Sequence, residues 1–112
     1  MIGLDAATAR AFALRLHDVG ALRFGTFTLK DGSTSPVYCD LRLLIADPDA
    51  LRLAGRIFAA LLAPLRYDVI AAIPYAGLPL GTVAALEVGR PMIFPRKEAK
   101  GYGAGNAIEG RY

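Results

Sequence analysis

The sequence contains little of what disulfides and protein-bound metals require. Among its 112 residues there is one cysteine, Cys39, one histidine, His17, and no tryptophan. A lone cysteine cannot form a disulfide within the chain, and one cysteine with one histidine is too few for a zinc site built from these side chains. We therefore expect a reducing compartment and predict no metal site made by the protein's own side chains.

Long apolar runs are missing where a leader or a membrane span would need them. Charged residues at positions 5, 10, 15 and 18 interrupt the first thirty residues, so these lack the apolar core of a signal peptide. The longest uncharged stretch, residues 69–86, contains two prolines and two glycines, which would break a membrane-spanning helix. The sequence therefore predicts a cytoplasmic protein with no membrane partner.

Charge is also scarce, because 21% of the residues are charged and 54% are hydrophobic. A chain of this length and composition can bury a core without disulfides, and we predict a single domain over residues 1–112. Residues 1–95 carry nine basic and eight acidic side chains, whereas residues 96–112 carry four and two. A net charge of +3 offers few contacts to a phosphate backbone, so we predict no nucleic-acid partner.

The order of apolar and turn-forming residues predicts the elements of the first half. Apolar residues three and four apart indicate a helix over residues 5–19. Asp31 and Gly32 separate two runs with β propensity between residues 22 and 40, which is typical of a hairpin. Asp47 followed by Pro48 is typical of a helix start, and we expect Phe58 on the buried face of that helix.

The second half predicts a strand, a helix and another strand. Residues 69–73 are apolar at every position, which favours a central parallel strand covered by helices on both faces. A turn at residues 74–77 leads into a helix that ends near Gly89, and residues 91–95 form the next strand. Such a unit is almost always right-handed, and it indicates an α/β fold with a parallel sheet flanked by helices.

Two candidate binding segments follow these strands, where parallel sheets bind their ligands. The first contains Tyr75 and Ala76, and the helix after it offers amide groups to an anion. An ordinary tight turn explains that segment equally well. The second places Arg96, Lys97 and Lys100 before alternating glycines around Tyr102, and we interpret it as a loop that closes over a phosphorylated ligand. A solvated charged loop is its alternative.

The hairpin is a third candidate. Lys30 lies near its turn and Tyr38 on the facing strand, so a cation and an aromatic ring could flank a flat anionic ligand. Alternatively, Phe27 and Tyr38 form a cross-strand pair and Lys30 is exposed. Cys39 has no neighbouring base in the sequence that would make it a nucleophile.

Three segments in this order resemble one enzyme family. They are FGTFTLKDGSTSPVYCDLRLL, YDVIAAIPYAGLPLGT and PMIFPRKEAKGYGAGNAIEGRY, and together they resemble orotate phosphoribosyltransferase, a type I phosphoribosyltransferase, from about residue 24 to residue 112. The resemblance implies an α/β core, a small hood formed by the N-terminal helix and the hairpin, and a homodimer. It implies transfer of ribose 5-phosphate from phosphoribosyl pyrophosphate to orotate, with Mg²⁺ carried by the diphosphate.

The resemblance also implies roles for individual residues. The orotate site would be lined by Lys30, Tyr38 and Cys39. The diphosphate-side turn would be Tyr75 and Ala76, and many members have lysine at the second of these positions. The loop that reaches the neighbouring subunit would comprise Arg96, Lys97, Lys100 and Tyr102. Lys100 and Arg96 would be its catalytic cations. Many members have histidine at the position of Tyr102.

One part of the family pattern is missing from this sequence. Members have a strand that ends in two adjacent acidic residues and a Thr/Gly-rich loop that holds the ribose 5-phosphate, and the 112 residues contain no adjacent acidic pair. We therefore expect the chain to carry the N-terminal part of the fold without its C-terminal part. A non-catalytic module that binds diphosphate or a nucleotide is the alternative to an enzyme.

Overall fold

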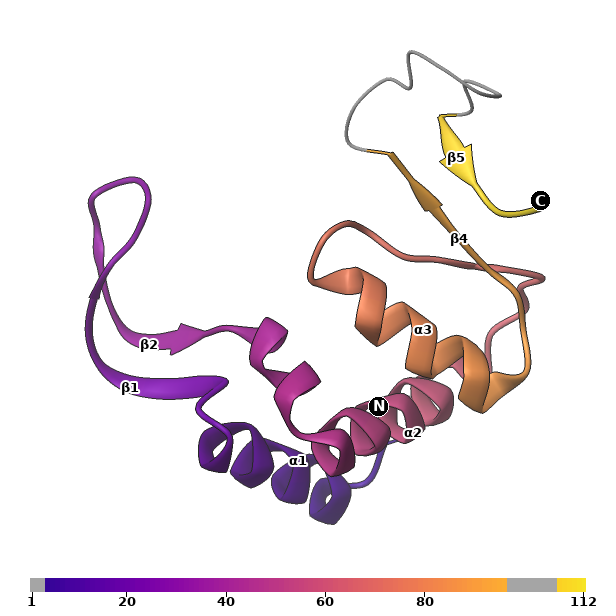
Figure 1. Ribbon diagram of the computed structural model, residues 1–112. Coiled ribbons are helices and arrows are strands. Elements are labelled where there is room, and N and C mark those ends of the chain that lie inside the picture. Colours follow the sequence, from indigo (N-terminus) through magenta and orange to yellow (C-terminus); the bar gives the residue numbers. More distant parts are fainter. Residues whose placement is uncertain (1–3, 97–106) are drawn as a thin grey trace. The chain divides into compact units, whose positions relative to one another are not determined.

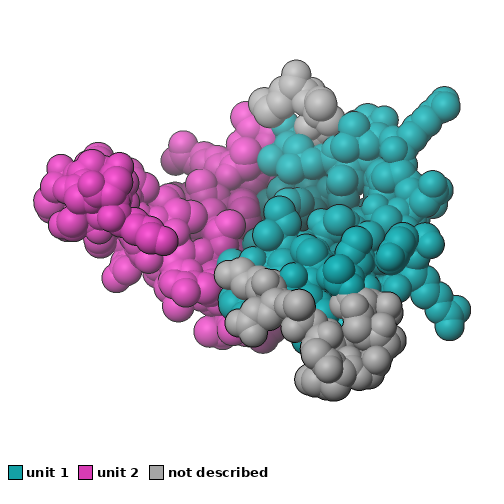
Figure 2. All heavy atoms as spheres, turned by 90° about the horizontal axis from the view of Figure 1, so that it is seen from above, with its two compact units in different colours: residues 1–4, 52–112 teal, residues 5–51 magenta. Residues whose placement is uncertain are grey.

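A computed structural model of the chain describes residues 4–96 and 107–112. The chain forms two compact units, shown in different colours in Figure 2. One unit spans Asp5–Leu51, and the other comprises Met1–Leu4 and Arg52–Tyr112. The expectation of a single domain over residues 1–112 stays a prediction.

The first unit begins with helix α1, Ala6–Asp18, followed by strands β1, Leu22–Thr28, and β2, Thr34–Cys39 (Figure 1). Asp5 caps the helix, because its Oδ1 accepts a hydrogen bond of 2.7 Å from the amide of Thr8. A short 3₁₀ helix, η1, covers Leu41–Ala46. The predicted N-terminal helix and hairpin are both confirmed.

The hairpin turns at the predicted residues. The amide of Leu29 donates to the carbonyl of Ser33, and the Asp31 carboxylate accepts from the amide of Ser33 at 2.9 Å. Gly32 has a φ of 87°, a conformation that favours glycine and explains why the turn needs it. The two strands are antiparallel and carry a bulge between Phe24 and Phe27.

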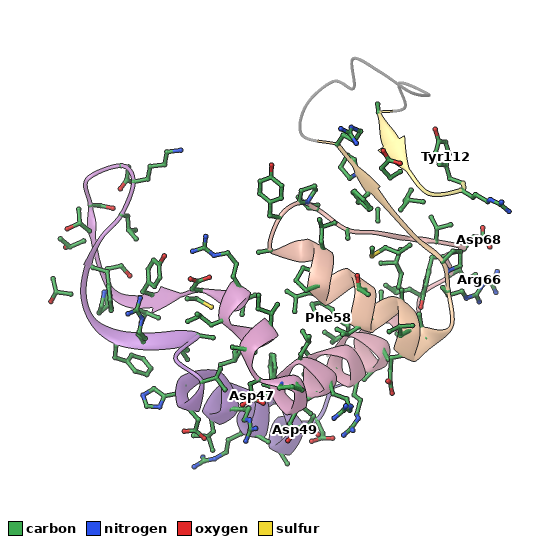
Figure 3. All side chains as sticks on the ribbon, in the orientation of Figure 1. Asp47, Asp49, Phe58, Arg66, Asp68 and Tyr112 are labelled. Carbon is green, nitrogen blue, oxygen red and sulfur yellow. The ribbon has the colours of Figure 1, made fainter. Side chains whose placement is uncertain are left out.

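Asp47 fixes the junction between η1 and helix α2, which spans Pro48–Leu62. Its Oδ1 accepts a hydrogen bond of 3.0 Å from the amide of Ala50, as the sequence predicts for a helix cap (Figure 3). The same carboxylate holds both of its oxygens within 3.1 Å of Nη2 of Arg15 in α1. Leu44 and Ala50 are fully buried beside it, so this carboxylate joins α1 to the core of the unit.

We expect the stability that Asp47 provides to depend on pH. Hydrogen bonds from Ala50 and Arg15 lower the pKa of Asp47, so its contribution is complete above the ordinary aspartate pKa of about 3.9 and disappears as the pH falls through the lowered value. Asp47→Ala removes cap and ion pair, whereas Asp47→Ser keeps a capping oxygen. Near neutral pH the melting temperature should be highest for the wild type, lower for Asp47→Ser and lowest for Asp47→Ala. At about pH 3 the differences between these melting temperatures should be smaller. Equal gaps at both pH values would contradict this account.

The second unit contains most of α2, strand β3, Ile70–Ala71, helix α3, Gly77–Val88, strand β4, Met92–Pro95, and strand β5, Ile108–Glu109 (Figure 1). Strands β3 and β4 are parallel, and β4 and β5 are antiparallel. Backbone bonds of 2.9 Å from Ile70 to Pro91 and from Ala72 to Ile93 align the parallel pair. The predicted strand, helix and strand are confirmed.

Helix α3 lies very close to the sheet at Gly81. A Cβ added to this glycine would lie 2.6 Å from the Cβ of Ala72 and 3.0 Å from the sulfur of Met92. Ala72, Leu80 and Ala84 are buried at this contact. The absence of a side chain at residue 81 therefore sets the distance between helix and sheet, and with it the positions of the loops at the sheet's edge.

Two expectations about burial are wrong for the residues that the structure describes. Ala71 is exposed and Ile73 is 74% exposed, so the described helices cover only the face of β3 that bears Ala72, and the prediction of helices over both faces fails. Phe58 of α2 is 37% exposed and borders an apolar groove with Leu62 and β3 (Figure 3). Apolar periodicity identifies the residues fit for burial, but the neighbouring layer decides which of them are covered. Among the described residues, every helix is too short or too polar to cross a membrane.

Candidate functional site

The second unit places two predicted segments at the same edge of its sheet. The turn with Tyr75 and Ala76 follows β3, and Arg96 follows β4. Because β3 and β4 are parallel neighbours, Tyr75, Ala76 and Arg96 lie beyond carboxyl ends, the edge at which open parallel sheets bind ligands. The predicted placement is confirmed for these three residues, and the rest of the second segment lies outside the described residues.

The turn presents its side chains outward. Tyr75 is 67% exposed, and its carbonyl accepts a hydrogen bond of 3.1 Å from the amide of Leu78 in the first turn of α3. The peptide bond between Pro74 and Tyr75 is cis. Ala76 directly precedes α3 and makes no side-chain cap, so this turn offers backbone and an aromatic hydroxyl rather than a cation.

Arg96 is fixed by a partner that the sequence does not predict. Its Nη1 lies 3.2 Å from Oε1 of Glu109, and both side chains are 32% exposed. Its backbone amide donates a bond of 2.8 Å to the carbonyl of Ala107.

The first unit brings together a different set of groups on its hairpin. The rings of Phe27 and Tyr38 lie 5.4 Å apart, and the guanidinium carbon of Arg23 lies 5.6 Å from the first ring centre and 5.2 Å from the second. These distances are typical of cation–π contacts. The hairpin thus carries an aromatic face with a cation on it, and that cation is Arg23.

The remaining predicted hairpin residues lie apart from this cluster. Lys30 is exposed on the turn, and Cys39 is an exposed free thiol at the end of β2. The rings of Phe27 and Tyr38 are in contact and Lys30 is exposed, as the alternative expected, but the two aromatic residues are not register partners, because Phe27 pairs with Ser35. Sequence reasoning missed Arg23, because only the observed register, which pairs it with Tyr38, places it on that face.

The carboxylate that follows the hairpin stays ionised. Arg42 donates from Nε and Nη2 to the two oxygens of Asp40 at 2.7 and 2.9 Å. These bonds to Arg42 are the main reason that the pKa of Asp40 is lowered, and the charge of Arg23 adds to the effect. The aromatic face therefore lies beside the Asp40–Arg42 ion pair, which is charged near neutral pH.

Three predicted site residues, Lys97, Lys100 and Tyr102, lie outside the described residues. Within residues 4–96 and 107–112, no group of three or more histidine, cysteine, aspartate or glutamate side chains is placed to bind a metal ion. The described groups can hold a flat ligand against the rings of the hairpin and an anion beside Arg96. Neither arrangement provides an activated nucleophile.

Comparisons with known proteins agree with this arrangement. No protein-family model matches the chain. It is 41% identical to the orotate phosphoribosyltransferase of Pyrobaculum aerophilum over 96 residues, which are 86% of this chain and 50% of that protein. The solved structure of Leishmania donovani UMP synthase matches 96% of the chain and 23% of its own length, with a TM-score of 0.81 and 42% identity.

A third match is the structure of Mycobacterium tuberculosis orotate phosphoribosyltransferase in complex with 5-phospho-alpha-D-ribosyl 1-diphosphate. It covers 94% of this chain and 57% of that one, with a TM-score of 0.67 and 25% identity. The chain thus spans about half of the length of the Pyrobaculum protein and of the Mycobacterium one. Its α/β fold is similar to part of the fold of the Leishmania UMP synthase and of the Mycobacterium orotate phosphoribosyltransferase.

Proposed function

We propose that this chain forms the N-terminal half of an orotate phosphoribosyltransferase, which converts orotate and phosphoribosyl pyrophosphate into orotidine monophosphate and diphosphate. One observation carries the proposal. Tyr75 and Arg96 follow the carboxyl ends of adjacent parallel strands, in a chain that is 41% identical over 86% of its length to an enzyme of this name. The edge of the sheet that binds ligands therefore carries residues suited to a diphosphate.

The reaction gives Arg96 a clear chemical task. The bond from C1 of the ribose to the diphosphate breaks and its electron pair leaves on the diphosphate, while a ring nitrogen of orotate loses its proton to solvent and bonds to C1. Negative charge accumulates on the departing diphosphate, and a cation already in place stabilises that charge best. The guanidinium of Arg96 is always charged and can donate a directed, charge-assisted hydrogen bond to a phosphate oxygen.

The hairpin supports the orotate half of the proposal. Orotate is flat and anionic, and the Phe27–Tyr38 face carries the charge of Arg23. We assign Tyr38, Cys39 and Lys30 to orotate binding, with Lys30 also reaching the phosphoribosyl group, and we add Arg23 as a source of positive charge. Residues Lys97, Lys100 and Tyr102 keep the roles that the resemblance implies, with Lys100 as the second catalytic cation.

Magnesium belongs to the proposal as a companion of the substrate. Mg²⁺ retains several water molecules and prefers phosphate oxygens, so it would arrive bound to phosphoribosyl pyrophosphate and neutralise part of its charge. We also propose a homodimer in the cytoplasm. The exposed free thiol of Cys39 fits a reducing compartment, and light scattering of the purified protein tests the dimer.

The test measures orotidine monophosphate formation from orotate, phosphoribosyl pyrophosphate and Mg²⁺. The chain is assayed alone and after coexpression with the remaining half of the Pyrobaculum aerophilum enzyme, because the chain covers 50% of that protein. We expect product in the combined sample. That product should depend on both halves, and Arg96→Met should remove most of it.

The binding-module alternative predicts a different outcome. Calorimetric titration of the chain with diphosphate at low salt would then show saturable, salt-sensitive binding, with no product in the assay of the combined halves. If the assay shows no product and the titration shows no binding, both the enzyme and the binding module are excluded. Binding with product supports the enzyme.

Arg23 has its own expected result. Arg23→Met keeps an unbranched side chain against the two rings but removes the charge, so we expect orotate binding to weaken up to about fivefold, the scale of one exposed ion pair of about 1 kcal/mol. Calorimetric titration with orotate measures it. Arg10→Met, on the exposed surface of α1, is the matched control and should bind as the wild type does. Equal affinity in both variants would exclude Arg23 from the orotate site.

A further inference from the structure

The proposed reaction does not explain why the carboxylate of Glu109 lies beside Arg96. It lies on β5 and places a carboxylate 3.2 Å from the guanidinium assigned to the diphosphate. A carboxylate beside a diphosphate site repels the ligand, so its presence there needs a reason. The geometry of the pair supplies one.

The strand register aims Glu109 at Arg96. Phe94 pairs with Glu109 and Pro95 with Ile108 across the antiparallel strands, and the bond from the Arg96 amide to Ala107 continues this register by one residue. Arg96 and Glu109 are therefore diagonal neighbours on one face of the strand pair, a separation that long side chains can bridge. The ion pair follows from the backbone pairing and does not depend on a chance surface contact.

The contact leaves part of the guanidinium for a ligand. A guanidinium has five N–H donors, and Glu109 accepts from Nη1. Nε is buried and has no hydrogen-bond partner within the described part of the chain, so it cannot turn toward solvent without losing its packing. Nη2 is the nitrogen that remains for an incoming anion once Nη1 is held.

We infer that Glu109 is a positioning residue, which holds Arg96 through Nη1 so that Nη2 points at a phosphate oxygen of the diphosphate. The inference rests on the proposed function for the identity of that ligand. A long arginine side chain loses rotamer freedom when it binds, and a carboxylate that fixes it beforehand reduces this loss. Glu109 therefore raises the affinity for diphosphate although its own charge repels it.

The test titrates the 112-residue chain with inorganic diphosphate and Mg²⁺ in a calorimeter. We expect Glu109→Ala to weaken binding about tenfold, the lower end of the loss seen when a metal ligand loses its supporting side chain. Glu109→Gln keeps an oxygen that accepts from Nη1 and should recover most of the affinity. Glu87→Ala, on the exposed face of α3, is the matched control and should bind as the wild type does.

A double-mutant cycle separates positioning from a general structural effect. In an Arg96→Met background, Glu109→Ala should not weaken binding further, because the group it positions is gone. The Nε–H resonance of Arg96 gives a readout without ligand, and it should broaden in Glu109→Ala and stay sharp in Glu109→Gln.

Each contrary result has a distinct meaning. Tighter binding in Glu109→Ala would show that the carboxylate competes with diphosphate and would overturn the inference, as would unchanged affinity together with an unchanged Nε–H resonance. If the wild type binds no diphosphate, the inference fails, and the product assay of the combined halves decides separately whether the proposed function fails too. If the wild type binds diphosphate and the Glu109 variants bind it equally well, the inference is overturned and the proposed function is not.

Discussion

Arg96→Met is expected to weaken diphosphate binding between about tenfold and a hundredfold, because a hydrogen bond to a charged group contributes roughly 1.5–3 kcal/mol. The variant keeps much of the side-chain bulk but loses all five donors and leaves Glu109 without its partner. Calorimetric titration with diphosphate and Mg²⁺ measures the effect. Formation of orotidine monophosphate by the combined halves should decrease at least as much, since the charge on diphosphate is greatest in the transition state.

Two further variants make this result specific. Arg96→Lys keeps the charge without the planar fork and should fall between wild type and Arg96→Met. Arg66→Met removes an exposed arginine from the loop between α2 and β3, away from the carboxyl ends of the strands, and should leave binding unchanged (Figure 3). If Arg66→Met were as damaging as Arg96→Met, diphosphate would be attracted by net charge and not by a site at the end of β4.

Gly81→Val is expected to destabilise the protein by about 3 kcal/mol or more, because overpacking a close contact costs roughly 1–3 kcal/mol and valine adds two methyl groups to a Cβ that already clashes. That Cβ would lie 2.6 Å from the Cβ of Ala72, which is buried directly after β3, is held by a backbone bond to Ile93 and cannot move aside as a long side chain would. Urea unfolding measures the loss, which is a large fraction of the total stability of an ordinary domain.

Gly77→Ala is the matched control for this variant. Residue 77 begins the same helix, and a Cβ there would lie 3.7 Å from its nearest neighbour, the Cβ of Ile73, which is an ordinary contact. Alanine favours helix by about 1 kcal/mol over glycine, so the control should be neutral or slightly stabilising. Equal losses at residues 77 and 81 would show that α3 does not depend on close approach to the sheet.

Sequence reasoning located most of the described elements, and it placed Tyr75, Ala76 and Arg96 at the ends of the parallel strands. Asp47 with Pro48, and Asp31 with Gly32, are local signals whose physics involves only neighbouring residues, and both were predicted correctly. The placement of Tyr75 and Arg96 needed only the order of strand, helix and strand. Local chemistry and chain order were sufficient for these features.

The hairpin cluster could not be read from the sequence, because a bulge changes its register. The turn is centred on residue 31, so an unbroken ladder would place Arg23 opposite Cys39, and the irregularity between Phe24 and Phe27 moves it opposite Tyr38. A shift of one residue changes the face on which a side chain lies. Lys30 was therefore the cation expected beside the ring, and Arg23 is the one in contact with it.

The sequence by itself determined the helix caps, the turn residues, the α/β order and the resemblance of its three segments to orotate phosphoribosyltransferases, since each depends on residues close together in the chain. The tertiary structure decided which cation meets the aromatic face, that Glu109 holds Arg96, and that only one face of β3 is covered by the described helices. These features depend on pairings between strands and on contacts between layers. Their free energy comes from residues distant in sequence, which no local pattern encodes.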